Sequence, residues 1–334
     1  MSRVTVSQHR FHRIAPAAIT LGLALMLVQS GSAIASSGTN VDALKQGIVA
    51  NSANATTTST TLGPFAGQPL TNVYVDGQMS FGAKHLSSVA SPWGSANQFY
   101  PPNLSGPGDF GILVRFNSIL YAPNFAGQGG SAAAGVLGAT TPWAPVSQVV
   151  TNAGHTVTTT ATAGVLRLVV ATNYTDGDGF FTHDMTFTNT GVPAISFDAF
   201  LASDLYTSGS DAGRPDLRGG TTCANDRQIT HSSLPISTLH QSGGWAVIWN
   251  QIRTGDLLNT VDPTNCVDNG AALEWKVASL AGGASTAILS KTTFGNSPAY
   301  VPSVTTWGIM LLTTLLASVG ILALKKRNNG SLSA

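Results

Sequence analysis

The chain has 334 residues, and the charged types Asp, Glu, Lys and Arg make up only 9% of them. That is far below the roughly 25% of an ordinary soluble domain, and a single Glu, Glu274, does not suit a protein of long exposed helices. Six of the 16 basic residues lie in the two ends of the chain, so the remainder has ten cations against 15 acids. The resulting formal charge of −5 argues against a nucleic-acid-binding protein.

The first 35 residues predict a secretory signal peptide. They begin with three arginines, continue with a mostly apolar stretch over residues 14–28 and end at Ala33-Ile34-Ala35, a small–x–small cleavage site. We expect export through the Sec translocon and cleavage after Ala35 by signal peptidase. An uncleaved N-terminal anchor is the alternative for this segment.

Residues 36–66 are rich in Ser, Thr, Ala and Asn and predict a low-complexity start or linker, with a short helix over residues 41–49 as the alternative. Residues 67–298 are expected to form the folded domain. Apolar and polar residues alternate there with period two, and turn signals such as Asn189-Thr190-Gly191 separate the runs.

Strands are predicted from residue 72 onward, with clear runs at residues 110–121, 155–161, 165–174, 180–188, 195–206, 245–253, 272–278 and 286–294. No helical period interrupts this series. The sequence therefore predicts a mainly β fold, a large antiparallel β-sandwich. Residues 186–211 and 266–271 resemble a large β-sandwich module of bacterial surface proteins, similar in build to the mutarotase-like supersandwich. That resemblance implies the fold class alone.

Two cysteines, Cys223 and Cys266, lie in the part predicted to be exported. An oxidising compartment favours a disulfide between them, closing a loop of about forty residues. A metal site with two cysteine ligands is the alternative, but no histidine lies at zinc-finger spacing from either cysteine.

Asp176, Asp178 and Asp184 are candidate calcium ligands, because carboxylates with glycines between them suit a cage of oxygen atoms. The segment Asp176-Gly177-Asp178-Gly179 is also a strong hairpin turn signal, and we favour the turn over a metal site. No metal and no cofactor is therefore predicted.

The densest group of charges lies in and around one loop. It is either a rim that binds sugar or an ion, or a solvated loop with internal salt bridges. Its members are Asp204, Asp211, Arg214, Asp216, Arg218 and Arg227.

The sequence contains no motif that predicts catalysis. The histidines of the predicted domain (His85, His155, His183, His231 and His240) lack metal-site spacing, and neither a nucleophile elbow nor a P-loop is present. A glycosidase needs two carboxylates flanking a bond, which in this chain would have to be an Asp pair. Tryptophans could form a carbohydrate platform, but Trp245, Trp249 and Trp275 lie in strand-like patterns that predict core positions.

The C-terminus combines a short motif, an apolar span and a basic end. Residues 307–324 contain no charge and predict a transmembrane helix of about 27 Å, close to the thickness of a bilayer. A buried helix of a soluble domain is the alternative. The residues of the motif and of the basic end are Val301, Pro302, Ser303, Val304, Trp307, Gly308, Lys325, Lys326 and Arg327.

Residues 301–327 resemble the sorting segment of the IPTL-CTERM family in the order of these parts. The family's start is Ile-Pro-Thr-Leu-like, so Ser303 and the two valines are departures. The resemblance implies a Gram-negative bacterium and processing by an exosortase-type membrane peptidase. We therefore predict an exported protein, tethered to the inner membrane and then released to the cell surface or matrix, without catalytic activity. An exopolysaccharide is a candidate partner, and a carbohydrate-binding or carbohydrate-active β-sandwich is the alternative function.

Overall fold

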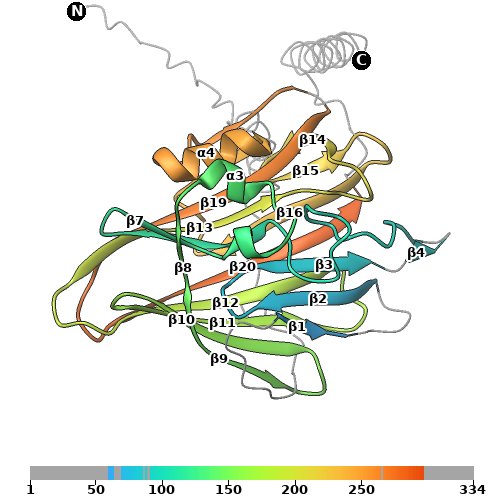
Figure 1. Cartoon of the computed structure of the whole chain (residues 1–334). Coiled ribbons are helices and arrows are strands. Elements are labelled where there is room, and N and C mark those ends of the chain that lie inside the picture. The colour runs from blue at the N-terminus through green and yellow to red at the C-terminus, as the bar shows by residue number, and fades with distance from the viewer. Residues whose placement is uncertain (1–58, 64–68, 86, 89–90, 265, 297–334) are drawn as a thin grey trace, which may run out of the picture. The chain divides into compact units, whose positions relative to one another are not determined.

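The computed structural model describes residues 59–63, 69–85, 87–88, 91–264 and 266–296. Most of their strands belong to one sheet of 15 strands, and the remaining strands form a three-stranded and a two-stranded sheet (Figure 1). The fold is mainly β and sandwich-like, as predicted. No helix in these ranges is long and hydrophobic enough to cross a membrane, and the predicted span at 307–324 lies outside them.

The large sheet runs in the order β8-β7-β6-β13-β19-β14-β15-β16-β20-β12-β11-β10-β9. Outside this order, β17 pairs with β19, and β18 pairs with β17. Neighbours are antiparallel except for the pairs β7/β8 and β17/β18. The first part comprises β6 (Phe110–Phe116), β7 (Ile119–Ala122), β8 (Thr141–Pro142), β13 (Ile195–Asp204), β17 (Leu239–Gly244), β18 (Thr260–Val261) and β19 (Val267–Leu280).

The rest of the large sheet comprises β9 (Ala144–Thr151), β10 (Thr156–Ala163), β11 (Leu166–Tyr174), β12 (Phe180–Asn189), β14 (Ala212–Asp216), β15 (Gly219–Thr222), β16 (Arg227–Leu234) and β20 (Ser285–Asn296). The smaller sheets comprise β1 (Ser59–Leu62), β2 (Leu70–Asp76) and β3 (Phe81–His85), and β4 (Ser87–Ser88) with β5 (Ser91–Pro92). Strand β1 falls within the stretch that the sequence assigned to a linker.

Two helices, α3 (Ala133–Leu137) and α4 (Trp245–Thr254), pack together on one side of the sheet, and η1 (Phe125–Gly127) lies beside α3 (Figure 1). The hydrophobic interior consists of two clusters of buried residues. On β13, Ala199 and Leu201 belong to the main core between the strand layers, whereas Phe200 and Ala202 belong to a second core under the helices. The layer β6-β13-β19 is therefore buried on both faces, and we call its helix-covered side the helix face.

The structure corrects two strand predictions. Residues 110–121 form β6 and β7 rather than one strand, because Asn117 and Ser118 adopt positive φ angles of 51° and 61° and turn the chain as in a tight hairpin. Residues 245–253 form helix α4. Its buried residues Ile248, Trp249 and Ile252 lie on one face of the helix and cover the second core.

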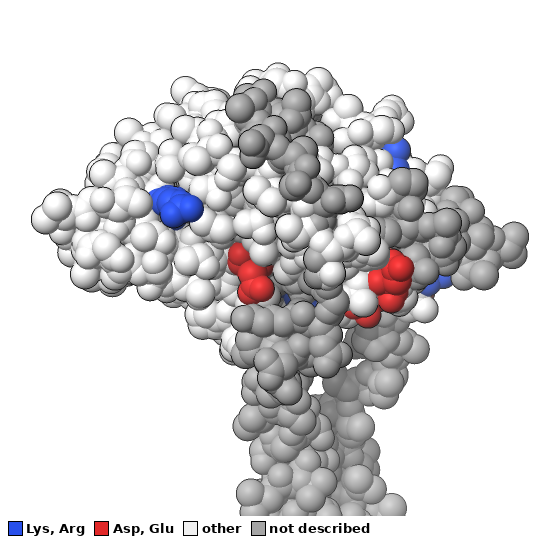
Figure 2. Space-filling view, turned by 90° about the horizontal axis from the view of Figure 1, so that it is seen from below, with Lys and Arg blue, Asp and Glu red and all other residues white. Residues whose placement is uncertain are grey.

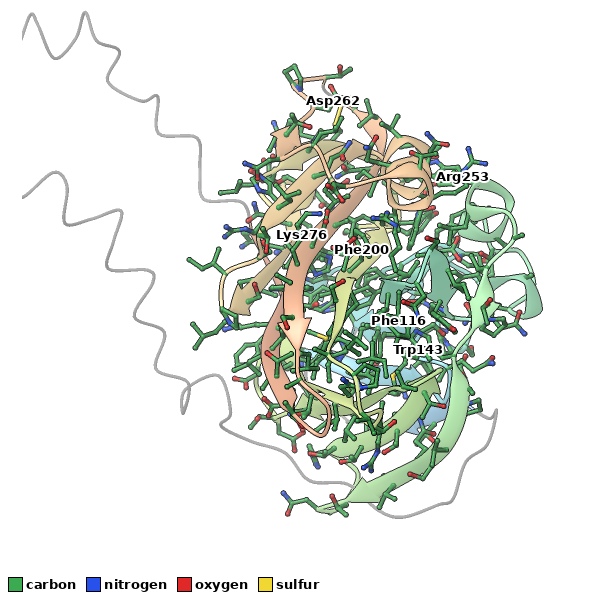
Figure 3. All side chains as sticks on the ribbon, turned by 90° about the vertical axis from the view of Figure 1, so that its left-hand side faces the viewer. Phe116, Trp143, Phe200, Arg253, Asp262 and Lys276 are labelled. Atoms are coloured by element: carbon green, nitrogen blue, oxygen red, sulfur yellow. A yellow bond between two sulfur atoms is a disulfide. The ribbon has the colours of Figure 1, made fainter. Side chains whose placement is uncertain are left out.

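The surface carries few charges. Figure 2, which views the molecule from below, shows isolated basic and acidic side chains on an otherwise uncharged surface. Inside, Phe116 and Trp143 belong to the main core between the layers, while Phe200 lies on the helix face (Figure 3). Recognition by this protein therefore has to depend on a few local charges and on neutral groups.

Candidate functional site

The helix face of β6-β13-β19 carries charged side chains at both ends. At the end near the C-terminus of α4, five of them form one network: Arg115 on β6, Asp198 on β13, Glu274 and Lys276 on β19, and Asp256 after the helix. Lys276 Nζ lies 2.7 Å from Asp256 and 3.1 Å from the buried Glu274. Every acid of this network has a cation within salt-bridge distance.

Three acids of this network also have the spacing of metal ligands. Asp198, Asp256 and Glu274 each place an oxygen atom within 4.8 Å of the others. The Lys276 ammonium already contacts all three, however, and Glu274 also accepts a hydrogen bond of 2.7 Å from the Leu257 N–H. We therefore assign this network a structural role, joining the end of α4 to the sheet.

The opposite end of the same face carries four carboxylates, Asp109, Asp204, Asp211 and Asp268, which we call the carboxylate cluster. Asp109 precedes β6, Asp204 ends β13, Asp211 precedes β14 and Asp268 lies near the start of β19. Backbone pairing holds these strand ends together. The Asp204 N–H donates to the Asp109 carbonyl, and the register pairs the residue after Asp211 with Asp268.

Asp109 is fully buried and fixed by three donors. Its carboxylate accepts hydrogen bonds from the Ser131 hydroxyl and from the backbone N–H groups of Ala132 and Ala133, at 2.7 and 2.8 Å. Ala133 is the first residue of α3, so Asp109 caps this helix. Burial nevertheless raises the pKa of Asp109 to about 6, since the three hydrogen bonds only partly offset the lost hydration.

Asp204 has the most perturbed environment of the four. Its side chain is 1% exposed, and Oδ1 has no hydrogen-bond partner within the described part of the chain. Burial raises its pKa to about 9, and the nearby charges of Asp109, Asp268 and Asp211 raise it further. Asp204 is therefore protonated at neutral pH.

Asp211 and Asp268 connect the cluster to solvent. Burial and the charge of Asp268 raise the pKa of Asp211 to about 6, and one of its carboxylate oxygens is buried without a hydrogen-bond partner in the part of the chain that the structure describes. Asp268 is exposed, and a hydrogen bond from the Trp245 side chain partly offsets the rise in its pKa that burial causes. None of the charges that shift these four pKa values belongs to a Lys or Arg.

An open groove of about 370 Å³ begins two strands away from Asp204. Gly270 pairs with Asp204 on one side and with Gly243 on the other, and Gly243 lines the groove. Two strand spacings are about 10 Å. The lining combines polar and apolar groups: Gln241, Ser242, Gly243, Gly244, Val247, Ile248, Leu258, Thr260, Val261, Asp262 and Pro263. In Figure 3, Asp262 lies at the upper end of the molecule, away from Lys276.

The charged loop predicted from the sequence divides into two parts. Asp204 and Asp211 belong to the carboxylate cluster. Arg214 instead pairs with Asp226, 2.5 Å away on the surface, and Asp216 accepts hydrogen bonds from Thr221 and Gln228. Arg227 lies over the Trp93 ring, with 5.9 Å to its centroid. These contacts agree with the interpretation as a solvated loop with internal salt bridges for Arg214, while binding of a sugar or an ion at the loop stays a prediction.

The predicted disulfide is present. Cys223 and Cys266 are bonded, with 5.7 Å between their Cα atoms. Cys266 lies two residues before Asp268, and the Cys223 N–H donates to the carbonyl of the residue after Asp211. The disulfide therefore ties together the two segments that carry the solvent-facing members of the cluster.

The calcium candidates lie elsewhere and are not brought together. Asp178 closes a turn with the Thr175 carbonyl, as the hairpin signal predicted, and Asp176 contacts His155 at 2.9 Å. Asp184 lies on β12, paired with Ala171. Among the described residues, the three aspartates do not form a group with metal-ligand spacing.

The remaining candidates are mostly structural. Trp93, Trp143, Trp249 and Trp275 are buried, as are His85, His183 and His231. His231 Nε2 lies 2.8 Å from the Ser203 hydroxyl and Nδ1 lies 3.1 Å from that of Thr292, inside the core. Ala33 and Ala35 and the sorting motif at 301–308 with the basic end at 325–327 lie outside the described residues.

The sequence matches no protein-family model and no curated protein. Three solved structures align with most of the chain at low similarity. They are described as a kojibiose phosphorylase from human microbiome (8% identity, TM-score 0.35, 80% of this chain), a bacterial glucoamylase complexed with acarbose (8%, 0.44, 75%) and an aldose 1-epimerase from Escherichia coli K12 (13%, 0.38, 72%). The chain covers 29% and 35% of the first two and 100% of the third. These scores are too low to assign a family or an activity.

Proposed function

We propose that this protein is an extracytoplasmic carbohydrate-binding protein, with its site at the carboxylate cluster and the adjoining groove. The observation that carries the proposal is the lack of compensating charges and donors in the cluster. Four acids lie together without a cation among the described residues, and Asp204 Oδ1 has no hydrogen-bond partner among those residues. Like charges held close together destabilise a fold. Such an arrangement is typical of a site that is completed by a ligand.

The groove has the size and chemistry of a site for sugars. Its volume lies within the range of about 300–1,000 Å³ that small-molecule sites occupy. Val247 and Leu258 are exposed apolar residues that suit the faces of sugar rings, and the polar lining residues Thr260 and Asp262 suit hydroxyl groups. This mixture fits a carbohydrate better than a purely apolar ligand.

We assign binding rather than hydrolysis to the site. The carboxyl group best suited by its pKa to act as a general acid is Asp204, and a general acid has to reach the glycosidic oxygen. Asp204 is 1% exposed, so its geometry suits a role behind the contact surface.

The test is calorimetric titration of the exported chain with a panel of soluble oligosaccharides. We expect one ligand class to bind to the wild type and to lose affinity in Asp268→Asn and Val247→Glu, both of which change exposed side chains. Absence of binding across the panel would refute the function. Release of new reducing ends would refute the assignment as a binding protein and favour a hydrolase.

For delivery, we propose the route that the terminal segments predict: export, retention at the inner membrane and processing by an exosortase-type peptidase. The support is the order of Val301-Pro302-Ser303-Val304, Trp307-Gly308, the uncharged span and the three cations. The test compares the mass and cell fraction of the tagged protein in an exosortase-bearing host and in its deletion strain. Full-length protein in the inner membrane of both strains would show an ordinary anchor.

A further inference from the structure

The two charged ends of the helix face differ in one respect. In the network around Lys276, three acids share the cations of Lys276 and Arg115. In the carboxylate cluster, the charges that raise the pKa of Asp204 and Asp211 are those of other acids. The same face of one sheet thus has one set of carboxylates with resident cations and one without.

The cluster also contains buried carboxyl oxygen atoms without a hydrogen-bond partner among the described residues. Asp204 Oδ1 and Asp211 Oδ1 are both buried, and neither has a hydrogen-bond partner among the described residues. Asp204 is protonated in the free protein at neutral pH, but a cation bound beside it favours the ionised carboxylate, which can accept up to about four hydrogen bonds and donates none. A group that completes the cluster therefore has to bring N–H or O–H donors, and a positive charge makes each such bond roughly twice as strong.

We propose that the glycan bound by this protein is a polymer of amino sugars with free amino groups, and that one ammonium group sits between Asp211 and Asp268, in front of Asp204. This inference rests on the proposed function and specifies its ligand class. An ammonium has three N–H donors and no acceptor, which matches a site that offers oxygen acceptors alone once Asp204 releases its proton. An N-acetylated sugar lacks the charge, and an acidic sugar is repelled.

The groove supports the same ligand class. Among the described residues that line it, Asp262 is the only ionisable one, so these residues add negative charge and no cation. It begins about 10 Å from Asp204, two strands away across the sheet. A ligand that fills both the cluster and the groove is therefore an oligomer, with its ring faces against Val247 and Leu258.

A divalent cation fits the cluster less well than an ammonium. Ca²⁺ takes six to eight oxygen ligands, whereas an ammonium is satisfied by two or three acceptors. Among the described residues, the spacing of metal ligands occurs in Asp198, Asp256 and Glu274, where Lys276 is already bound, and not in the cluster. Divalent-cation binding is therefore an outcome against the proposal.

The experiment titrates the full exported chain, with its disulfide intact, with two oligomers of equal length: one of glucosamine and one of N-acetylglucosamine. The two differ only at the sugar nitrogen, which is an ionisable amine in the first and a neutral acetamide in the second. We expect the glucosamine oligomer to bind at least about tenfold more tightly, the effect of losing one charge-assisted hydrogen bond. Asp204→Asn and Asp268→Asn should remove this preference. Asp226→Asn, a surface acid already paired with Arg214, is the matched control and should retain it.

Each other outcome overturns a distinct statement. Equal affinity for both oligomers, or binding of neutral oligosaccharides alone, refutes the amino-sugar class and leaves the carbohydrate-binding function in place. Absence of binding to either oligomer and to the wider panel refutes that function. A rise in melting temperature with CaCl₂ alone, lost in Asp204→Asn and not reproduced by glucosamine oligomers, refutes the ammonium site and makes the cluster a metal site.

Discussion

Replacing Asp204 by Asn should make the protein more stable at neutral pH. The pKa of Asp204 rises from the ordinary 3.8 to about 9 on folding, so between these values the folded state holds a proton that the unfolded state has released. From 3.8 to pH 7 is just over three units, each worth about 1.4 kcal/mol. The native aspartate therefore costs on the order of 4 kcal/mol at pH 7, and a neutral amide of the same shape removes most of this cost.

The sign and the pH window make this prediction specific. Asp204, Asp109 and Asp211 bind more protons in the folded state, whereas His85, His183 and His231, whose pKa burial lowers to about 3, bind fewer, so the two sets oppose each other below about pH 6.5. Stability of the wild type should therefore fall as pH rises from about 7 to about 9. Between pH 7 and 8.5, Asp204 dominates, with a slope of about 1.4 kcal/mol per pH unit. Denaturant unfolding of both proteins across this window measures it. Equal slopes, or a less stable Asp204→Asn variant, would refute the electrostatic argument.

Three further changes probe the surrounding structure. Reducing the Cys223–Cys266 bond, which spans 43 residues, should lower the free energy of unfolding by about 4 kcal/mol in denaturant titrations with and without reductant. Trp249→Ala empties the second core and should destabilise by about 3–5 kcal/mol in the same assay. Lys276→Met leaves the buried Glu274 without its cation. Because Lys276 is itself 35% exposed, we expect the free energy of unfolding to fall by only about 1–2 kcal/mol. This loss should be smaller at low pH, where Glu274 is protonated.

The strands could be predicted because their signal is local. Alternation and turn residues located β10, β11, β12 and β13 within a few residues of their observed bounds. The order of strands in the sheet could not be predicted, because it depends on long-range pairing: β12 lies beside β20, some hundred residues away in the chain. Sequence periodicity does not determine such partners.

Helix α4 shows where local propensity fails. Its segment begins Trp-Ala-Val-Ile-Trp, residue types that favour strands, and it was predicted as one. The structure makes it a helix because Trp249 and Ile252 then cover the second core, where Trp249 contacts Phe125 with 5.5 Å between ring centroids. Tertiary burial outweighs a propensity difference of less than about 1 kcal/mol per residue.

Two of the four acids of the carboxylate cluster could be identified from the sequence. Asp204 and Asp211 stood out because charge is rare in this chain, but Asp109 and Asp268 did not, since each lies far from that loop in sequence. Asp109 immediately precedes the buried run of β6, and Asp268 follows the second cysteine by two residues. The predicted disulfide already implied that the segments after Asp211 and before Asp268 lie close together. Combining these two signals would have indicated three of the four acids.

Holding the carboxylate cluster together lowers the stability of the folded structure, and this loss of stability is evidence about the function of the cluster. Asp109 is fixed by the start of α3, Asp268 by Trp245 at the start of α4, and the disulfide ties the segments of Asp211 and Asp268. The other end of the same face shows that this fold accommodates Lys and Arg between its carboxylates. Neutralising Asp204 in place would remove the cost without altering the backbone. An arrangement that is expensive and easily avoided is therefore best explained by a positively charged ligand that compensates it on binding.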